Sequence, residues 1–228
     1  MSHKKYQVEN FELQYSSDWI HKLESLDHWK YYWHQAYLVQ KNIDKNFRII
    51  EIGIGSSFLA NYLKSRNWEV ITIDIDPEKK PDIVGDISST DLSDLDIQCV
   101  IAFEVFEHLP FPLFVRTINN ISTIKPRFII FSLPLAKRNL LKISVKLPKI
   151  RNLNLSFSIN KKAVTTPNHF WELKRRAKQN ETVLSKGEKG FVSKQVMKEV
   201  FINNGFQVND GPIVNRIQFF IAKNKYYA

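Results

Sequence analysis

The chain has 228 residues, of which 43% are hydrophobic, and a formal net charge of +10 at pH 7. This length accommodates one α/β domain with an insertion but is short for two independent hydrophobic cores. The single cysteine, Cys99, excludes an internal disulfide and a zinc site built on cysteines, and it fits a reducing compartment. Segment 1–10 is polar and charged, and no run approaches the roughly 18 apolar residues of a membrane span. We therefore expect a cytoplasmic protein without a transmembrane segment.

The first predicted element is helical. Apolar residues between positions 19 and 39 recur at spacings of three and four, as in an amphipathic helix. We expect residues 1–46 to form a helical N-terminal cap on the domain. The aromatic residues of this stripe are interpreted as core, with a position facing a substrate pocket as the alternative. Three histidines of the region are interpreted as surface or packing residues: His21, His28 and His34.

From residue 48 onward, short apolar strands alternate with helical patterns, which is typical of a parallel sheet with helices on both faces. Residues 47–135 and 191–228 are interpreted as the two parts of one Rossmann-like α/β domain. Gly205 is expected to end its last helix. Strands are predicted at 48–52, 69–73, 82–84, 98–103, 127–133, 206–208 and 217–222, and helices at 57–66, 112–121 and 193–204.

Residues 136–190 do not follow this alternation and are interpreted as an insertion after the fifth strand. Ligands of such folds bind beyond the carboxyl ends of the strands, so the insertion lies where it can select the substrate. Segment 137–178 contains twelve Lys or Arg residues and one acid, Glu172. This charge predicts an anionic partner, which is a small molecule, a nucleic acid or a membrane surface, with a solvated surface insertion as the alternative. The apolar run 140–147 is the part that would contact a membrane peripherally, and a strand or a buried helix is its alternative.

A glycine-containing turn follows the first strand of the core. Gly53 and Gly55 allow the backbone to approach a ligand closely, and the N–H groups of the next helix point at it. Phe58 stands where a nicotinamide-binding turn would need glycine or alanine, which disfavours that cofactor. The spacing from Glu51 through the two glycines instead resembles the first motif of class I S-adenosylmethionine-dependent methyltransferases. Ser57 replaces the third glycine of that motif and is expected to cap the helix.

This resemblance implies a seven-stranded, mostly parallel sheet closed by an antiparallel pair at its edge, and S-adenosylmethionine as the cofactor. Glu51 would face the methionine ammonium group, often through water. Asp74, or alternatively Asp76, would accept the ribose hydroxyls at the end of the second strand. Asp86 would accept the adenine amino group, and Ile87 would pack on the ring. The implied cofactor-binding residues are Glu51, Gly53, Gly55, Ser57, Asp74, Ile75, Asp86, Ile87, Phe103 and Glu104.

Segment 103–110 resembles the Glu-Val-Leu-Glu-His-Leu signature found after the fourth strand in many small-molecule methyltransferases, including ubiquinone-biosynthesis O-methyltransferases. This resemblance implies that Glu107 and His108 face the methyl acceptor. The enzyme has to position the acceptor and remove its proton, a task that suits histidine. His108 and the distant His169 are therefore candidate general bases, with packing roles as the alternative for both.

The interpretation that we favour from the sequence assigns no metal ligand. Its alternative is a divalent cation held by Glu104, Glu107, His108 and His169, the first three of which have the i, i+3, i+4 spacing of one helical face. A similar pattern occurs in small-RNA 2′-O-methyltransferases, where the metal binds the terminal ribose.

The leading functional prediction is methyl transfer to an oxygen or nitrogen of a small or conjugated, anionic acceptor. One alternative is an RNA ribose methyltransferase that uses the basic segment 137–178. Another is a non-catalytic cofactor-binding or partner-binding protein of the same fold. Methylation of base amines is disfavoured because segment 102–105 lacks an Asn/Asp-Pro-Pro-aromatic motif, and cytosine C5 methylation because Cys99 is not in a Pro-Cys turn.

Overall fold

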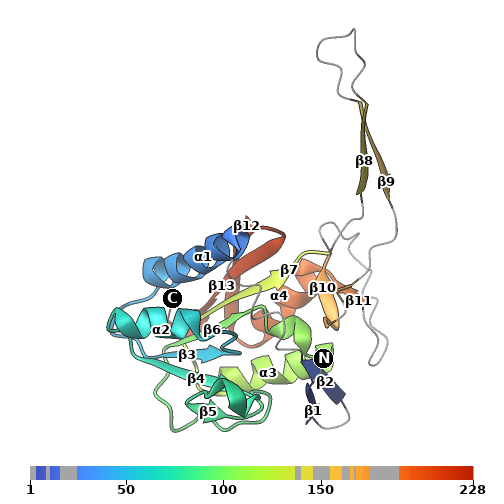
Figure 1. Ribbon diagram of the computed structural model, residues 1–228. Coiled ribbons are helices and arrows are strands. Elements are labelled where there is room, and N and C mark those ends of the chain that lie inside the picture. Colours follow the sequence, from blue (N-terminus) through green and yellow to red (C-terminus); the bar gives the residue numbers. More distant parts are fainter. Residues whose placement is uncertain are drawn as a thin grey trace.

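A seven-stranded sheet forms the centre of the protein (Figure 1). The computed structural model describes residues 4–8, 11–15, 25–136, 140–145, 155–160, 165–166, 168–174 and 190–227. The sheet order is β12-β13-β7-β6-β3-β4-β5. All neighbours pair in parallel except β13, which is antiparallel to both β7 and β12. The strands are β3 (Ile49–Ile52), β4 (Val70–Asp74), β5 (Ile83–Val84), β6 (Cys99–Phe103), β7 (Phe128–Pro134), β12 (Phe206–Val214) and β13 (Ile217–Asn224).

This sheet confirms the predicted Rossmann-like fold, including the antiparallel pair at its edge. The predicted strands agree with the observed ones within one or two residues except at the end of β12, which continues to Val214. Gly205 follows the last helix with a φ of +85°, as its predicted role at the helix end requires.

Helices cover both faces of the sheet. In β7, Phe131 packs on one face and Ile130 on the other, because successive side chains of a strand point in opposite directions. The first face carries α3 (Phe111–Thr123) and α4 (Lys194–Asn203), and the second carries α1 (Leu26–Asn42) and α2 (Phe58–Ser65). Figure 1 shows these two layers on opposite sides of the strands. The described residues also form three short 3₁₀ helices: η2 (Pro77–Lys79), η3 (Phe106–His108) and η4 (Lys225–Tyr227).

The N-terminal region is less helical than the predicted cap. The chain forms an antiparallel hairpin from β1 (Lys4–Val8) and β2 (Phe11–Tyr15), and helix begins only at Leu26. Both hairpin segments alternate apolar and polar residues, which favours a strand over a helix. Ser25 caps α1 by accepting a hydrogen bond from the backbone of His28. His21 lies outside the described residues.

The predicted insertion contains two further strand pairs. Antiparallel strands β8 (Leu140–Val145) and β9 (Leu155–Asn160) make a hairpin, so the apolar run there is a strand over its described part. Strands β10 (Trp171–Leu173) and β11 (Gly190–Val192) pair in parallel. The Trp171 side chain is fully buried and donates a hydrogen bond to the Leu109 carbonyl, which ties β10 to the core. Within the part of the chain that the structure describes, no helix is both long and apolar enough to cross a membrane.

Candidate functional site

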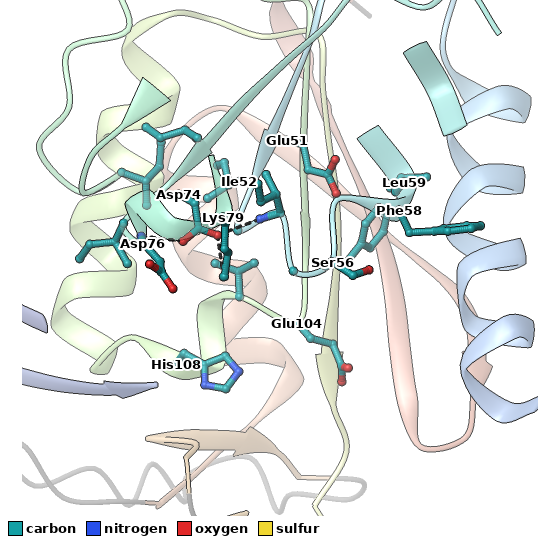
Figure 2. Close-up of a pocket in the computed structure, with 18 of the residues that line it drawn as sticks. Glu51, Ile52, Ser56, Phe58, Leu59, Asp74, Asp76, Lys79, Glu104 and His108 are labelled. Atoms are coloured by element: carbon teal, nitrogen blue, oxygen red, sulfur yellow. Dashed lines mark hydrogen bonds and ion pairs between the residues drawn. The ribbon is translucent and has the colours of Figure 1, made fainter. Parts of the chain in front are cut away.

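A cavity of about 420 Å³ opens at the carboxyl ends of β3, β4 and β6. In chain order, β3 is the first strand of the seven-stranded sheet, and it lies between β6 and β4. The order of the strands therefore reverses at β3, and ligands of α/β folds bind at such a point. Most of the predicted site residues line this cavity (Figure 2). Ser57 and Glu107 do not line it directly. The predicted residues in its wall are Glu51, Gly53, Gly55, Asp74, Ile75, Asp86, Ile87, Phe103, Glu104, His108 and His169.

The turn after β3 admits glycine and little else at Gly53. Its φ is +70°, and a Cβ atom there would lie 2.6 Å from the Val105 side chain. Ser57 also has a left-handed backbone, with a φ of 60°, and its side chain makes no capping hydrogen bond. The prediction that Ser57 caps the helix is therefore wrong. Ser57 stands where the motif usually has its third glycine, and glycine adopts this left-handed backbone conformation without strain.

Glu51 is buried at the end of β3 with one oxygen, Oε2, that has no hydrogen-bond partner. Burial raises the pKa of Glu51 to about 8, against the lowering effect of a hydrogen bond from the Ala60 backbone. A buried carboxylate with a free oxygen in a cavity wall is suited to a cationic group of a ligand. The side chain and its place in the wall therefore fit the methionine ammonium group of S-adenosylmethionine.

Asp74 and Asp86 have more partners within the chain. Asp74 Oδ2 accepts hydrogen bonds from the Ile54 backbone at 3.0 Å and from Lys79 Nζ at 2.8 Å, and Oδ1 accepts one from the Asp76 backbone. Oδ1 thus keeps one lone pair for a hydroxyl group of a ligand. Asp86 accepts hydrogen bonds from the backbone and hydroxyl of Ser88. These contacts hold both carboxylates at the cavity wall and join the turn after β3 to β4.

Glu104 lies at the end of β6 with a left-handed φ of 54°. Helical backbone begins two residues later, at Phe106, so Glu104 does not share a helical face with Glu107 and His108 as the spacing predicted. Burial raises the pKa of Glu104 to about 7, and the positive charge of Arg216 opposes this rise. Glu104 lines the cavity but is not part of the group described next.

Glu107, His108 and His169 come together at one side of the cavity. One ligand atom from each lies within 4.8 Å of the others, and the two imidazole rings are 5.0 Å apart at an interplanar angle of 88°. η3 supplies the first two residues, and the loop before β10 supplies the third. A hydrogen bond of 2.8 Å from the Phe170 backbone to the Glu107 carbonyl holds this loop against η3.

Both histidines of this group are oriented by their Nδ1 atoms. His108 Nδ1 lies 2.9 Å from the Asn168 carbonyl, and His169 Nδ1 lies 3.0 Å from Glu172 Oε1. A carbonyl and a carboxylate only accept hydrogen bonds, so Nδ1 carries the hydrogen in each neutral ring and Nε2 keeps its lone pair. A histidine that donates Nδ1–H to a carboxylate or carbonyl is the arrangement found around protein-bound metal ions.

Glu107 is fully buried, and neither of its carboxylate oxygens has a hydrogen-bond partner. Burial, together with the nearby Glu104, raises the pKa of Glu107 well above its usual range. Such a group is costly to bury unless a cation or a ligand completes it. Two imidazole nitrogens and a carboxylate form a donor set for a divalent metal ion such as Zn²⁺, Mn²⁺ or Co²⁺.

The electrostatics of His108 favour a ligand role. Burial, reinforced by the nearby His169, lowers the pKa of His108 to about 4, so its ring is neutral at pH 7. A neutral ring with so low a pKa is a weak general base but is the form that binds a metal ion. Burial opposes ionisation of Glu172, but hydrogen bonds from His169 and Thr166 outweigh it and hold the pKa of Glu172 below its usual range.

Sequence reasoning missed several residues of this site. His28, which was interpreted as a surface or packing residue, lines the cavity from α1. Tyr31 and Gln35 on the same helix also line it, and the sequence did not single them out. Lys79 reaches the cavity from η2 and pairs with Asp74. Glu172 was noted only as the single acid of the basic segment. Its position three residues after His169 was the available signal, because a carboxylate next to a candidate ligand often orients it.

The fold is that of the class I S-adenosylmethionine-dependent methyltransferases. Among solved structures, the chain is similar to magnesium protoporphyrin IX methyltransferase from Synechocystis PCC 6803 with bound S-adenosylmethionine (TM-score 0.51, 12% identity). The match covers 91% of this chain and 84% of that protein. The small RNA methyltransferase HEN1 matches 86% of this chain over 25% of its own length (TM-score 0.55, 15% identity). At these identities, the likeness to the solved structures is a likeness of fold.

In sequence, the chain is 33% identical over 85 residues to a small RNA 2′-O-methyltransferase from Caenorhabditis elegans. That match covers 36% of this chain and 19% of the relative, so the chain corresponds to a minor part of that protein. No protein-family model matches the chain.

Proposed function

We propose that this protein is an S-adenosylmethionine-dependent methyltransferase that methylates a ribose 2′-hydroxyl at the end of an RNA strand with the aid of a divalent cation. The observation that carries the proposal is the cluster of Glu107, His108 and His169, in which one ligand atom from each residue lies within 4.8 Å of the others. The local likeness to a small RNA 2′-O-methyltransferase supports the same acceptor.

The residues around the cavity suit S-adenosylmethionine. Glu51 offers its unpartnered oxygen to the methionine ammonium group, and Asp74 Oδ1 offers a lone pair to the ribose hydroxyls. Gly53 keeps the turn free of a side chain that would collide with Val105. Asp86 and Ile87 lie in the wall where the adenine would bind. When bound, this cofactor supplies an activated methyl group on a sulfonium.

Methylation of a hydroxyl requires the loss of its proton. A divalent cation bound to the hydroxyl would lower its pKa, as metal ions do for bound water. His108 and His169 then serve as ligands through Nε2, which replaces the general-base role that the sequence suggested. Glu107 contributes the negative charge that balances part of the charge of the cation.

A polyanionic acceptor also agrees with the charge of the chain. Segment 137–178 carries twelve Lys or Arg residues against one acid, and it includes the loop that supplies His169. Repeated cationic contacts with phosphates add affinity that falls steeply with salt. The proposed acceptor thus replaces the small anionic molecule that led the sequence-based prediction, while it keeps the anionic character.

The test is methyl transfer from labelled S-adenosylmethionine to a short single-stranded RNA, with EDTA and with added Mg²⁺, Mn²⁺ or Co²⁺. The matched acceptor is the same RNA ending in a 2′-deoxynucleotide, and mass spectrometry of the digested product locates the methyl group. We expect cation-dependent methylation of the terminal ribose and none of the deoxy-terminated RNA. Glu107→Gln should lose this activity, whereas His34→Ala, on α1 and outside the cavity, should retain it.

Full activity in EDTA, or equal labelling of both RNAs, would contradict the proposal. Calorimetric titration with S-adenosylmethionine separates the remaining cases. If the protein binds the cofactor but does not methylate RNA, the sequence-based prediction of a small anionic acceptor would be favoured instead. Absence of both would favour the non-catalytic alternative.

A further inference from the structure

Helix α1 has a second apolar face that does not contribute to the core. Leu26, Trp29, Trp33 and Tyr37 follow one another at spacings of three and four, so they lie on one side of the helix. Their exposed fractions are 71%, 48%, 59% and 41%, respectively. A helix packed on a sheet needs only one apolar stripe, and α1 supplies it with other residues, including the fully buried Val39. The exposed stripe therefore requires another explanation.

This stripe forms one wall of a groove between α1 and α2, with a volume of about 690 Å³. The rings of Trp33 and Tyr37 lie parallel, with centroids 4.9 Å apart and an interplanar angle of 8°. On α2, Phe58 and Tyr62 are also parallel, at 6.4 Å and 9°. We name this surface the aromatic groove; it is lined by Trp29, Tyr32, Trp33, Ala36, Tyr37, Gln40, Lys41, Phe58 and Tyr62.

The charge around the aromatic groove is positive. Lys41 Nζ lies 5.5 Å from the centroid of the Tyr37 ring, and the Arg66 guanidinium lies 6.0 Å from the Tyr62 ring. None of the described residues that line the groove is acidic, and Ala36 is the single aliphatic residue among them. Aromatic rings combined with cations are suited to flat rings attached to an anionic backbone, whereas an apolar peptide face would be matched by aliphatic side chains.

The aromatic groove adjoins the cavity of the candidate active site. Tyr32 and Phe58 line both of them, and their rings lie 4.6 Å apart at the boundary. The Tyr32 hydroxyl also lies 3.4 Å from Ser56 Oγ in the turn after β3. The groove therefore lies next to the cavity, separated from it by the side chains of Tyr32 and Phe58.

We infer that the aromatic groove binds the single-stranded RNA next to the methylated nucleotide, with bases stacked on Trp29, Trp33 and Tyr37. This inference rests on the proposed function and adds to it a second contact surface outside the cavity. Stacking on aromatic side chains accepts any base, so the groove provides affinity without sequence preference. It also selects single strands, because the base faces of a duplex are already stacked.

The experiment measures the binding of fluorescently labelled RNA to the full chain saturated with S-adenosylhomocysteine, by anisotropy. A dinucleotide, a longer single strand and a duplex of the same sequence are compared. The wild-type protein should bind the longer strand more tightly than the dinucleotide or the duplex. Trp33→Ala combined with Tyr37→Ala should weaken binding of the longer strand on the order of a hundredfold, and that of the dinucleotide little. Tyr226→Ala, which removes an exposed aromatic ring elsewhere, should change neither.

Two further variants guard against a folding defect. Trp33→Phe with Tyr37→Phe keeps the rings and should restore most of the affinity, and Lys41→Glu should weaken binding without removing a ring. In steady-state methylation, the double alanine variant should raise KM for the longer RNA and retain kcat at saturation.

Equal binding of the longer strand by the wild-type and double alanine proteins would overturn the inference, and it would leave the proposed function intact if RNA is still methylated. If the wild-type protein neither binds nor methylates RNA, the proposed function fails instead. Loss of S-adenosylhomocysteine binding in the double variant, or conversion of a wild-type dimer into a monomer, would assign the groove to the cofactor site or to a second copy of the chain.

Discussion

We divide the site into a cofactor half, which we propose binds S-adenosylmethionine through Glu51, Asp74 and Asp86, and an acceptor half around Glu107, His108 and His169. The two halves differ in how completely the chain satisfies its own polar groups. In the cofactor half, Asp74 accepts three hydrogen bonds, and Asp86 accepts others from Ser88. In the acceptor half, both carboxylate oxygens of Glu107 lack a hydrogen-bond partner. His108 and His169 each donate a hydrogen bond through Nδ1, which leaves the Nε2 lone pair for a ligand. Glu51 is the exception in the cofactor half, with its one unpartnered oxygen.

This difference indicates which parts of each ligand the protein binds by charge. Hydrogen bonds within the chain preform the wall to which we assign the neutral ribose and adenine, so binding there should cost little rearrangement. The places left open, at Glu51 and at Glu107, are those where the proposed ligands carry positive charge. A buried carboxylate without a partner destabilises the free protein and is completed only by binding.

The largest expected effect comes from removing the charge of the acceptor half with Glu107→Gln. Methylation should fall on the order of ten-thousandfold, which corresponds to about 5 kcal/mol of transition-state stabilisation. Cofactor binding should be unchanged. Thermal unfolding in EDTA should show no loss of stability, because the carboxylate has no partner to lose. Weaker cofactor binding in this variant would contradict the division of the site into two halves.

A second prediction concerns the pH dependence of Glu51. Its folded pKa of about 8 lies above its ordinary value of 4.5, so the folded state retains a proton that the unfolded chain releases. Stability should therefore fall as the pH rises from about 4.5 through 8, and Glu51→Gln should abolish this fall. At pH 8 the variant should be more stable on the order of 4 kcal/mol.

The measurement for Glu51 is urea unfolding of both proteins across this pH range. Cofactor titrations in buffers of different ionisation enthalpy give an independent check. Near pH 7 the wild-type protein should release a proton when the cationic cofactor binds, and Glu51→Gln should release less. Parallel stability profiles of the two proteins would show that Glu51 is ionised in the free protein.

Glu172 sharpens the comparison, because it contacts the acceptor half through a hydrogen bond with His169. Glu172→Gln keeps a hydrogen-bond acceptor for His169 but removes the charge, so the Kd of the activating cation should rise ten- to a hundredfold. The affinity for the cofactor should stay the same. Titration of activity with Mn²⁺ measures the first quantity and calorimetry the second. An unchanged cation Kd would limit Glu172 to a packing role.

The smallest expected effect is at Ser57 in the cofactor half. Its left-handed backbone is strained for serine, and its side chain makes no capping bond that a substitution would remove. Ser57→Gly should therefore stabilise the protein by about 1 kcal/mol in urea unfolding and should not weaken cofactor binding. Destabilisation would show that the serine side chain has a contact in solution that compensates for the strain.

Sequence signals brought most of the predicted cofactor-binding residues to one cavity because these signals are local. Glu51, Asp74 and Asp86 each follow or end a short apolar strand, and parallel strands bring their carboxyl ends to one edge of the sheet. Two predictions that depended on the backbone angles of residues other than glycine failed. Spacing alone placed Glu104 on a helical face and a capping bond at Ser57, but both residues have a positive φ that composition and periodicity do not encode.

The sequence by itself determined the seven-stranded fold, the glycine turn and the candidate residues of both halves, because strand periodicity and turn chemistry act over a few neighbouring positions. Only the tertiary structure decided which candidates meet. His169 reaches Glu107 and His108 through contacts between segments 60 residues apart, such as the hydrogen bond from His108 Nδ1 to the Asn168 carbonyl. The interpretation of the aromatic stripe of α1 as core was wrong for most of its rings, which the tertiary structure leaves exposed. Burial depends on what packs against a residue, which is a property of distant segments and not of local sequence.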